Sequence, residues 1–122
     1  MRRVLLVDNE PPVRRMLADV LRGAGYGVFV AASGVEALEM LPSLEPDLVM
    51  VDVHMPGFDG WATLAEVHSV APEMRVMMMS GSDCSEDALA RGAIAFLAKP
   101  YRPSDVLAGV ERALRTAQAD AA

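Results

Sequence analysis

Five short apolar runs alternate along the chain with segments in which apolar residues recur at helical spacing. Most of the runs are apolar at successive positions and not only at every second one, which is typical of strands buried on both faces. The runs cover residues 4–7, 27–30, 48–51, 76–79 and 93–97. Because strands of this kind lie between layers of helices, the pattern predicts five buried parallel strands with helices above and below them.

Each run is followed by a segment whose apolar residues suit one face of a helix. Ser33 and Glu36, three residues apart, form a capping-box pattern that predicts the start of the second helix. We expect the third helix to start at Asp59, the fourth to span residues 83–91 and the fifth to follow Pro103. The residues predicted to face the core are Val13, Met16, Leu17, Val20 and Leu21 in the first helix, Val35, Leu38 and Leu41 in the second, Trp61, Leu64 and His68 in the third, and Leu107, Val110 and Leu114 in the fifth.

The strict alternation of strands and helices predicts the fold class. Parallel neighbours need a crossover connection, and such crossovers are right-handed almost without exception. The sequence therefore predicts an α/β fold, a single doubly wound (βα)5 domain with a five-stranded parallel sheet. In sheets of this kind ligands bind beyond the carboxyl ends of the strands. Candidate functional residues are accordingly those that follow each apolar run.

Polar side chains suited to chemistry follow four of the five runs. The second run is the exception, because it ends in three small uncharged residues, Ala31-Ala32-Ser33. The residues at the other four ends are Asp8, Asn9 and Glu10 after the first run, Asp52 after the third, Ser80 after the fourth and Lys99 after the fifth. We expect acidic oxygens from two strands, a hydroxyl and an ammonium to meet at one edge of the sheet.

These side chains together suit phosphoryl transfer with the help of a divalent cation. Carboxylates brought close together repel one another, and oxygen ligands with room for water favour Mg²⁺. A carboxylate beside such a cation can attack phosphorus and form an aspartyl phosphate, a role that fits Asp52. The cation and Lys99 would neutralise charge on the transferred group, and Ser80 would donate a hydrogen bond to it.

Each of these residues also has a simpler interpretation when it is taken alone. Asp8 and Asn9 are common helix-capping residues, and Asp52 could merely begin a loop. A lysine or serine at a strand end is often only solvated. The two histidines, fourteen residues apart and without cysteine partners, match no zinc-site spacing. The occurrence of all four polar strand ends in one chain favours the shared site.

Length and charge narrow the class of protein. A chain of 122 residues fits one domain, for which we take residues 1–122, with 117–122 as a tail or the start of a linker. The single cysteine cannot form an internal disulfide, and no apolar run approaches the ~18 residues of a membrane span. A net charge of −6 disfavours direct contact with nucleic acid. We therefore expect a cytoplasmic protein without a membrane partner.

Four segments together resemble the receiver domain of bacterial two-component response regulators, in particular those of the chemotaxis-regulator type. One is the acidic group at residues 8–10, and another, VDVHMPGFDG at residues 51–60, is similar to the phosphoacceptor loop of that family. The others are SG at residues 80–81 and FLAKP at residues 96–100. Each segment is weak evidence alone, but all four stand in the right order at strand ends. The resemblance extends over residues 3–117.

The resemblance implies a fold and a set of residue roles. The domain would be flavodoxin-like, with strand order 2-1-3-4-5. Asp52 would accept the phosphoryl group, and Lys99 and Ser80 would contact it. Phe96 would be the switch aromatic, and the Lys99–Pro100 peptide bond would be cis.

The resemblance also implies a site for Mg²⁺, with Mn²⁺ as an alternative. The ligands would be Asp8, Asp52 and the backbone carbonyl of His54. In the family two acids usually follow the first strand and the second binds the metal directly, but that position here is Asn9. Because an amide oxygen contributes no charge, we expect weakened affinity unless Glu10 or a water held by Asp8 compensates. Asn9 and Glu10 are therefore additional candidate ligands.

The function implied is a phosphorylation switch and not a turnover enzyme. Its donor would be a sensor histidine kinase or a phosphotransfer protein. Phosphorylation would remodel the surface of the fourth helix, fifth strand and fifth helix, where an effector domain or protein, or a second copy of the chain, would bind. A phosphorylation-independent binding module is the alternative that Asn9 motivates. A hydrolase with an aspartyl nucleophile is disfavoured, because the second aspartate of such enzymes corresponds to His54.

Overall fold

The computed structural model describes residues 1–115, and within them strands and helices alternate strictly from β1 to α5. The strands are β1 Arg3–Val7, β2 Gly27–Ala31, β3 Leu48–Asp52, β4 Val76–Ser80 and β5 Ala95–Ala98. The helices are α1 Pro11–Gly23, α2 Gly34–Leu44, α3 Gly60–Val70, α4 Ser85–Ala90 and α5 Pro103–Arg115. In this part of the chain no helix is long and apolar enough to cross a membrane. The tail predicted at residues 117–122 lies outside the described residues.

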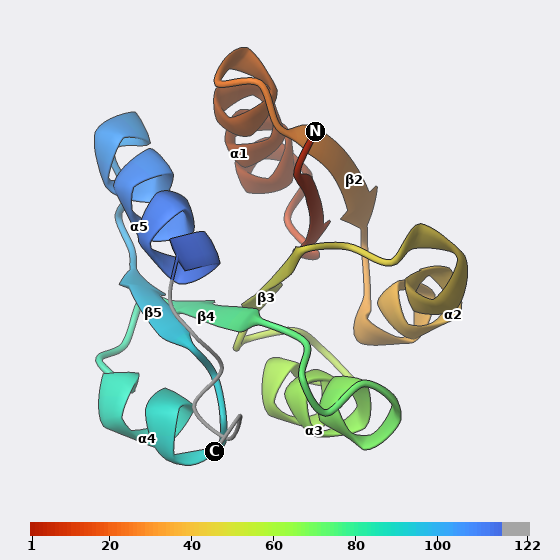
Figure 1. Ribbon diagram of the computed structural model, residues 1–122. Helices are drawn as coiled ribbons and strands as arrows, with labels where there is room; N and C mark the ends of the chain where they lie inside the picture. The colour runs from red at the N-terminus through yellow and green to blue at the C-terminus, as the bar shows by residue number, and fades with distance from the viewer. Residues whose placement is uncertain (116–122) are drawn as a thin grey trace.

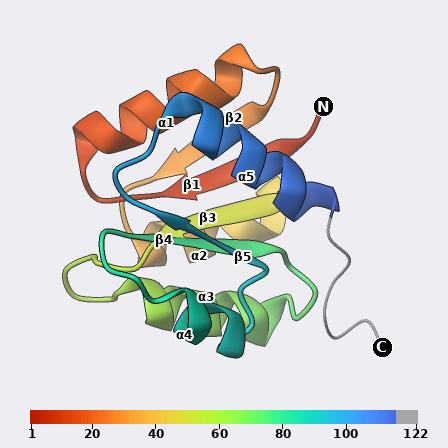
Figure 2. The ribbon, with the colours of Figure 1, turned by 90° about the vertical axis from the view of Figure 1, so that its left-hand side faces the viewer.

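The strands form one parallel sheet in the order β2-β1-β3-β4-β5. Helices α1 and α5 cover one face of the sheet, and α2, α3 and α4 cover the other (Figures 1 and 2). The doubly wound α/β fold predicted from the alternation is therefore confirmed, and so is the strand order that the resemblance implied. Because the strands are parallel, their carboxyl ends share one edge of the sheet.

Strand β1 shows why the predicted strands are apolar at successive positions. Val4 and Leu6 pack in the core between the sheet and helices α1 and α5. Leu5 and Val7 pack in the second core, between the sheet and helices α2, α3 and α4. All four residues are fully buried, and β3 and β4 are buried along their whole length in the same way. The three central strands thus belong to both cores at once.

The edge of the sheet at β2 is more exposed than the sequence pattern predicts. Within residues 1–115 β2 pairs with β1 alone, and Phe29 and Val30 are 39% and 38% exposed. An apolar run does not reveal whether its strand is central or lies at an edge. The predictions for Met16 and Val35 are wrong. Met16 is 37% exposed on α1, and Val35 faces solvent while Ala37 and Leu41 face the core from α2.

Two elements in the second half of the chain are shorter than predicted. Helix α4 spans Ser85–Ala90 because Asp83 forms a turn before it, with Oδ1 accepting hydrogen bonds from Ser85 N at 3.3 Å and Ser85 Oγ at 3.0 Å. Strand β5 starts at Ala95 and not at residue 93. The backbone N–H of Ala93 still donates to the carbonyl of Ala88 at the end of α4, over 2.9 Å. The predicted order of elements holds, and the errors lie at their ends.

Side-chain caps mark the starts of α2 and α3 as predicted. Ser33 Oγ accepts from Glu36 N at 3.1 Å, and Glu36 Oε1 accepts from Ala32 N at 2.7 Å. Asp59 Oδ1 accepts from Ala62 N at 2.9 Å, so Asp59 is the N-cap of a helix that begins one residue later. Such caps satisfy backbone donors that the first helical turn leaves unpaired.

Gly60 allows the start of α3 to pack directly against the end of β3. Its backbone N–H donates to the carbonyl of Val53 over 3.0 Å. A Cβ atom at this position would lie 2.6 Å from Val53 Cα and would also press on the carbonyl of Asp52. Because both neighbours are backbone, no side chain fits here. This contact holds the loop that follows Asp52 against α3.

We predict that Gly60→Ala lowers the free energy of unfolding by about 2–3 kcal/mol, because the added methyl group overpacks against backbone that cannot move aside. Denaturant unfolding followed by circular dichroism measures this. Gly23→Ala is the control, since nothing lies within 4 Å of a Cβ at that position, and we expect it to change stability by less than about 1 kcal/mol. Equal stability of the two variants would contradict the close contact described here.

Candidate functional site

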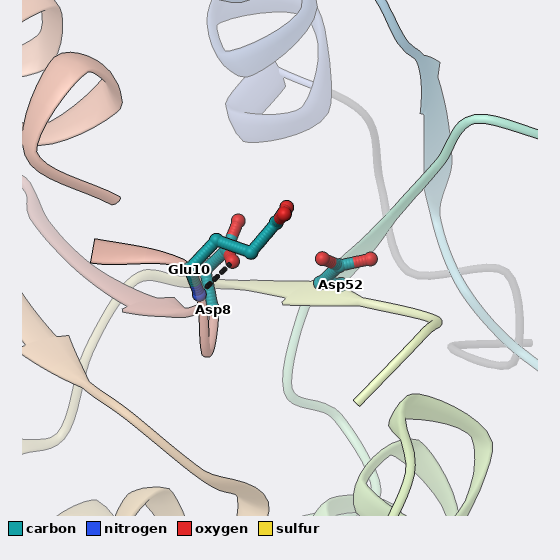
Figure 3. Close-up of side chains that lie close together, drawn as sticks. All are labelled: Asp8, Glu10 and Asp52. Carbon is teal, nitrogen blue, oxygen red and sulfur yellow. Dashed lines mark hydrogen bonds between the residues drawn. The ribbon is translucent and has the colours of Figure 1, made fainter. Parts of the chain in front are cut away.

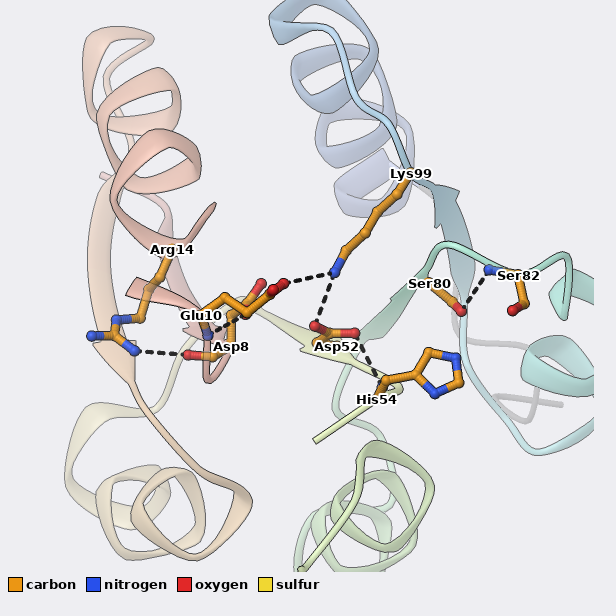
Figure 4. A network of polar contacts seen from close by, with 8 residues as sticks. All are labelled: Asp8, Glu10, Arg14, Asp52, His54, Ser80, Ser82 and Lys99. Atoms are coloured by element: carbon orange, nitrogen blue, oxygen red, sulfur yellow. Dashed lines mark hydrogen bonds and ion pairs between the residues drawn. The ribbon is translucent and has the colours of Figure 1, made fainter. Parts of the chain in front are cut away.

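Four strand ends meet at one place because β1, β3, β4 and β5 are successive neighbours in the sheet. Asp8 follows β1, Asp52 ends β3, Ser80 ends β4 and Lys99 follows β5. Figure 4 shows these side chains around one space, with Asp52 between Glu10 on one side and Ser80 on the other. The structure thus brings together the side chains that the sequence placed at four separate strand ends.

Asp52 is held by a donor on each of its carboxylate oxygens. Oδ2 accepts a hydrogen bond from Lys99 Nζ at 3.0 Å, and Oδ1 accepts one from the backbone N–H of His54 at 3.1 Å. Its side chain is only 1% exposed, so these contacts are largely shielded from water. The carboxylate is therefore oriented from two sides and carries one positive partner.

Lys99 remains a cation in this setting. Burial alone would lower the pKa of its ammonium group, but the hydrogen bond that it donates to Asp52 and the charges of the nearby carboxylates outweigh burial and raise that pKa. The backbone N–H of Lys99 donates to the carbonyl of Ser80 over 2.8 Å, which ties it to the end of β4. The Lys99–Pro100 peptide bond that follows is cis. Lys99 thus faces the pocket from a well-anchored position.

Asp8 is completely buried, and its carboxylate is only half satisfied. Oδ1 accepts from the backbone N–H of Glu10 at 2.9 Å, whereas Oδ2 is buried with no hydrogen-bond partner among residues 1–115. Burial raises the pKa of this carboxyl group; the Glu10 hydrogen bond opposes the rise and the charge of Asp52 adds to it. A carboxylate in such a place lacks the positive charge that a bound cation would supply.

Three carboxylates form what we call the acidic cluster, namely Asp8, Glu10 and Asp52. Each places one oxygen within 4.8 Å of the others. Figure 3 shows the three side chains from close by. Glu10 is 56% exposed and also lies 3.5 Å from Lys99 Nζ. Hard oxygen donors gathered in this way repel one another and suit a divalent cation such as Mg²⁺. The acidic cluster can therefore hold a cation directly beside Asp52.

Asn9 and His54 border the acidic cluster in different ways. Asn9 Oδ1 is buried and has no hydrogen-bond partner in the described part of the chain, so a neutral oxygen is available there. The His54 side chain is exposed and turns away from the acidic cluster in Figure 4, so its contribution would come from the backbone. His68 lies elsewhere, with Nε2 3.0 Å from the carbonyl of Met74.

Ser80 and Phe96 lie beyond Asp52 on the side of β4 and β5. Ser80 is fully buried, and its Oγ accepts from the backbone N–H of Ser82 at 3.0 Å. Its hydroxyl proton can therefore still be donated to another group. Phe96 pairs with Met78 in the sheet and packs, half-buried, against the core under α2, α3 and α4. Ser80 borders the pocket, whereas Phe96 lies on β5 two residues before Ala98, the residue that pairs with Ser80.

Two residues near the pocket were not found from the sequence. Arg14 Nη1 donates to the backbone carbonyl of Asp8 at 2.9 Å and so holds the first turn of α1 to the end of β1. Tyr101 has a buried hydroxyl without a partner within the described residues. Burial, followed by the charges of the acidic cluster, raises the pKa of Tyr101. The only available signals were their spacings, six residues after Asp8 and two after Lys99.

A family model described as the response regulator receiver domain matches residues 4–111. Among curated proteins, the chain is 39% identical over 116 residues to the transcriptional regulatory protein PdtaR of Mycobacterium tuberculosis. The alignment covers 93% of this chain and 57% of PdtaR. The chain therefore spans little more than half the length of this relative.

Solved structures show the same likeness. The chemotaxis protein CheY4 of Vibrio cholerae superimposes with a TM-score of 0.88 at 30% identity, covering 93% of this chain and 98% of that one. The response regulator TrrA of Thermotoga maritima, solved with Mg²⁺ and BeF, gives a TM-score of 0.84 at 27% identity. Its alignment covers 93% of this chain and 99% of TrrA. The fold agrees with both.

We predict that Asp8→Asn raises the free energy of unfolding by about 1 kcal/mol in buffer without divalent cations, because it removes a buried charge that lies near the like charge of Asp52 and has one oxygen without a hydrogen-bond partner in the described residues. The comparison is thermal unfolding of both proteins in a chelating buffer. Asp19→Asn, at an exposed position of α1, is the control and should change little. Destabilisation by Asp8→Asn under these conditions would contradict the unsatisfied carboxylate.

Proposed function

The chain belongs to the response regulator receiver domain family, and on this premise we propose that it is a signalling switch phosphorylated on Asp52. In related proteins, receiver domains pair with histidine kinases. The proposed donor is therefore a phosphohistidine of a sensor histidine kinase or of a phosphotransfer protein. One observation carries the choice of Asp52. It is a buried carboxylate, paired with Lys99, within a cluster of carboxylates at the carboxyl edge of the sheet.

Asp52 would act as the nucleophile. One of its oxygens attacks the phosphorus of the phosphohistidine; a P–O bond forms while the P–N bond breaks, and the electron pair leaves on the imidazole nitrogen. The hydrogen bonds from Lys99 and from the His54 backbone hold the carboxylate in one orientation for this attack. The Lys99 ammonium then offsets the charge of the phosphoryl oxygens.

Asp8, Asp52 and the backbone carbonyl of His54 are the proposed ligands of Mg²⁺, with Asn9 and Glu10 as further candidates. The buried oxygens of Asp8 and Asn9 that lack partners within residues 1–115 support this donor set. When bound, the cation neutralises charge on the carboxylates and on the transferred group. Mn²⁺ takes the same kind of oxygen ligands and stays a prediction.

Ser80 and Phe96 are the proposed switch residues. Ser80 Oγ has a proton to donate, and a phosphoryl group on the neighbouring strand would bring about −1.5 to −2 charges as its acceptor. Movement of Ser80 would open space that Phe96 fills from its half-buried position. Because Phe96 lies on β5 between α4 and α5, its repacking would change the α4-β5-α5 surface. Such a coupling is typically worth about 1–3 kcal/mol.

The α4-β5-α5 surface is the proposed binding site for an effector domain or an effector protein, or for a second copy of the chain. The alignment covers 57% of the transcriptional regulatory protein PdtaR, so in that relative the matched region is accompanied by a further segment. This supports an effector domain as the partner of the α4-β5-α5 surface. We propose no direct contact of this domain with nucleic acid and no enzymatic turnover. Phosphorylation-independent partner binding is the second candidate, because Asn9 stands where the family usually has a charged ligand.

We predict that the protein gains the mass of one phosphoryl group when it is incubated with acetyl phosphate and Mg²⁺. Intact-protein mass spectrometry measures the gain, and a chelator should abolish it because the cation neutralises the charge of the donor. Asp52→Asn keeps the shape of the side chain but should prevent the gain. Asp47→Asn, at the opposite end of β3, is the matched control.

If the wild type stays unmodified while a reference receiver domain is phosphorylated, Asp52 is not a phosphoacceptor under these conditions. Partner binding that survives Asp52→Ala would then favour the phosphorylation-independent module. Modification that persists in Asp52→Asn would place the phosphoryl group on another residue.

We predict that the Ser80→Ala variant still accepts the phosphoryl group on Asp52 but that the α4-β5-α5 surface responds to it less. Loss of one hydrogen bond to a phosphoryl oxygen should weaken the coupling by about 1 kcal/mol, or roughly fivefold in the population shift. The measurement is the change in amide chemical shifts across α4, β5 and α5 when beryllium fluoride and Mg²⁺ are added. Ser69→Ala, at an exposed position of α3, should behave as the wild type. Full shifts in Ser80→Ala would remove Ser80 from the switch.

A further inference from the structure

We propose that Glu10 is a movable carboxylate, which pairs with Lys99 in the resting pocket and transfers to the cation when the cation binds. In this role Glu10 supplies the negative charge that Asn9 lacks. Lys99 then loses its contact with Glu10, and its ammonium group pairs only with Asp52 and the phosphoryl group on it. The inference rests on the proposed function, because it concerns the same cation site. Figure 4 shows the Glu10 side chain extending toward Lys99, and Figure 3 shows it beside Asp8 and on the same side as Asp52.

The contact between Glu10 and Lys99 is the weaker of the two ion pairs that Lys99 makes. Glu10 Oε1 lies 3.5 Å from Lys99 Nζ, whereas Asp52 Oδ2 lies at 3.0 Å. The Glu10 side chain is 56% exposed, and the Asp52 side chain is 1% exposed. Exposed ion pairs contribute little to stability, so Glu10 can leave Lys99 at small cost while Asp52 remains.

The same glutamate is already close to the place where a cation would be held. Its carboxylate lies within 4.8 Å of those of Asp8 and Asp52. Ligand oxygens around Mg²⁺, with bonds of about 2.0–2.1 Å, are about 2.9–4.2 Å apart, so a small side-chain rotation brings Glu10 into range. The Glu10 backbone is meanwhile anchored by its hydrogen bond to Asp8 Oδ1 at 2.9 Å. Only the flexible part of the side chain has to move.

The buried ligands also carry too little negative charge for a divalent cation, and a third carboxylate would supply it. Two buried oxygens, Asp8 Oδ2 and Asn9 Oδ1, lack hydrogen-bond partners in the described part of the chain and point to a missing positive group. Of these two neighbouring residues only Asp8 is charged, so the buried ligands contribute one negative charge fewer than a pair of acids would. Glu10 follows Asn9 directly and is the remaining carboxylate of the acidic cluster.

The first test is the affinity for Mg²⁺ alone, measured by titration calorimetry without any phosphoryl donor. We expect Glu10→Gln to weaken binding at least about tenfold, because it removes a charged ligand. Asn9→Asp in the Glu10→Gln background should restore binding to near the wild-type value, since the charge returns one residue earlier. Glu39→Gln, at an exposed position of α2, is the matched control and should bind as the wild type.

The second test follows Lys99 itself, which is the only lysine in the sequence. Biosynthetic ¹³C labelling of lysine therefore reports on this one side chain and leaves its three N–H donors unmodified. Without Mg²⁺ we expect nuclear Overhauser contacts from the Lys99 Cε protons to the side chains of both Glu10 and Asp52. At saturating Mg²⁺ the contacts to Glu10 should disappear and those to Asp52 should remain.

The outcomes separate this inference from the proposed function. Unchanged Mg²⁺ affinity in Glu10→Gln, or contacts between Lys99 and Glu10 that persist at saturating Mg²⁺, would overturn the movable carboxylate while phosphorylation of Asp52 stands. Failure of the wild type to bind Mg²⁺ at all would overturn both. Normal thermal unfolding of Glu10→Gln in chelating buffer shows that any loss of binding does not come from misfolding.

Discussion

The ion pair between Lys99 and Asp52 is the interaction around which the pocket is arranged. It joins the end of β3 to the residue that follows β5, across the intervening strand β4, so it forms only when these three strands are in register. Desolvation of a buried pair offsets much of its electrostatic attraction, so its main effect is to orient Asp52 and not to stabilise the fold. Stability comes instead from the two cores, into which β1, β3 and β4 insert side chains from both faces. The sheet can therefore carry an acidic cluster that weakens its own edge.

The fold was predictable because its strongest signal is local. Strands that are apolar at successive positions, separated by segments of helical spacing, leave few alternatives to a parallel sheet covered on both faces. The errors occurred where tertiary position overrides local pattern. Phe29 and Val30 are as apolar as the central strands but lie at an edge, and Val35 turns outward because Ala37 and Leu41 fill the inner face of α2. Helix and strand ends depended on single turns, such as the one that Asp83 forms before α4.

The sequence predicted which residues form the site, but it did not predict how deeply each is buried or which residues it contacts. Parallel strands bring their carboxyl ends to one edge, so the polar residues after four runs had to meet once the order of strands was known. Nothing in the sequence distinguished the buried Asp8 from the exposed Glu10 two residues later, because burial there depends on where α1 begins. Tyr101 is partly buried by packing against the core on the α1 and α5 side of the sheet, and periodicity carries no information about such contacts.

The pocket combines short, buried side chains with longer, more exposed ones. Asp8 and Asp52 stand at strand ends, fully or almost fully buried, and each is held by a backbone N–H two residues further along the chain. Glu10 and Lys99 have longer side chains and are 56% and 24% exposed. A ligand arriving at this edge would thus find two carboxylates already in place, while the charges that must change partners lie on the flexible residues. The two buried aspartates would fix where phosphorus and cation sit, and the cost of admitting them would be small because the contact that has to break, between Glu10 and Lys99, is an exposed one.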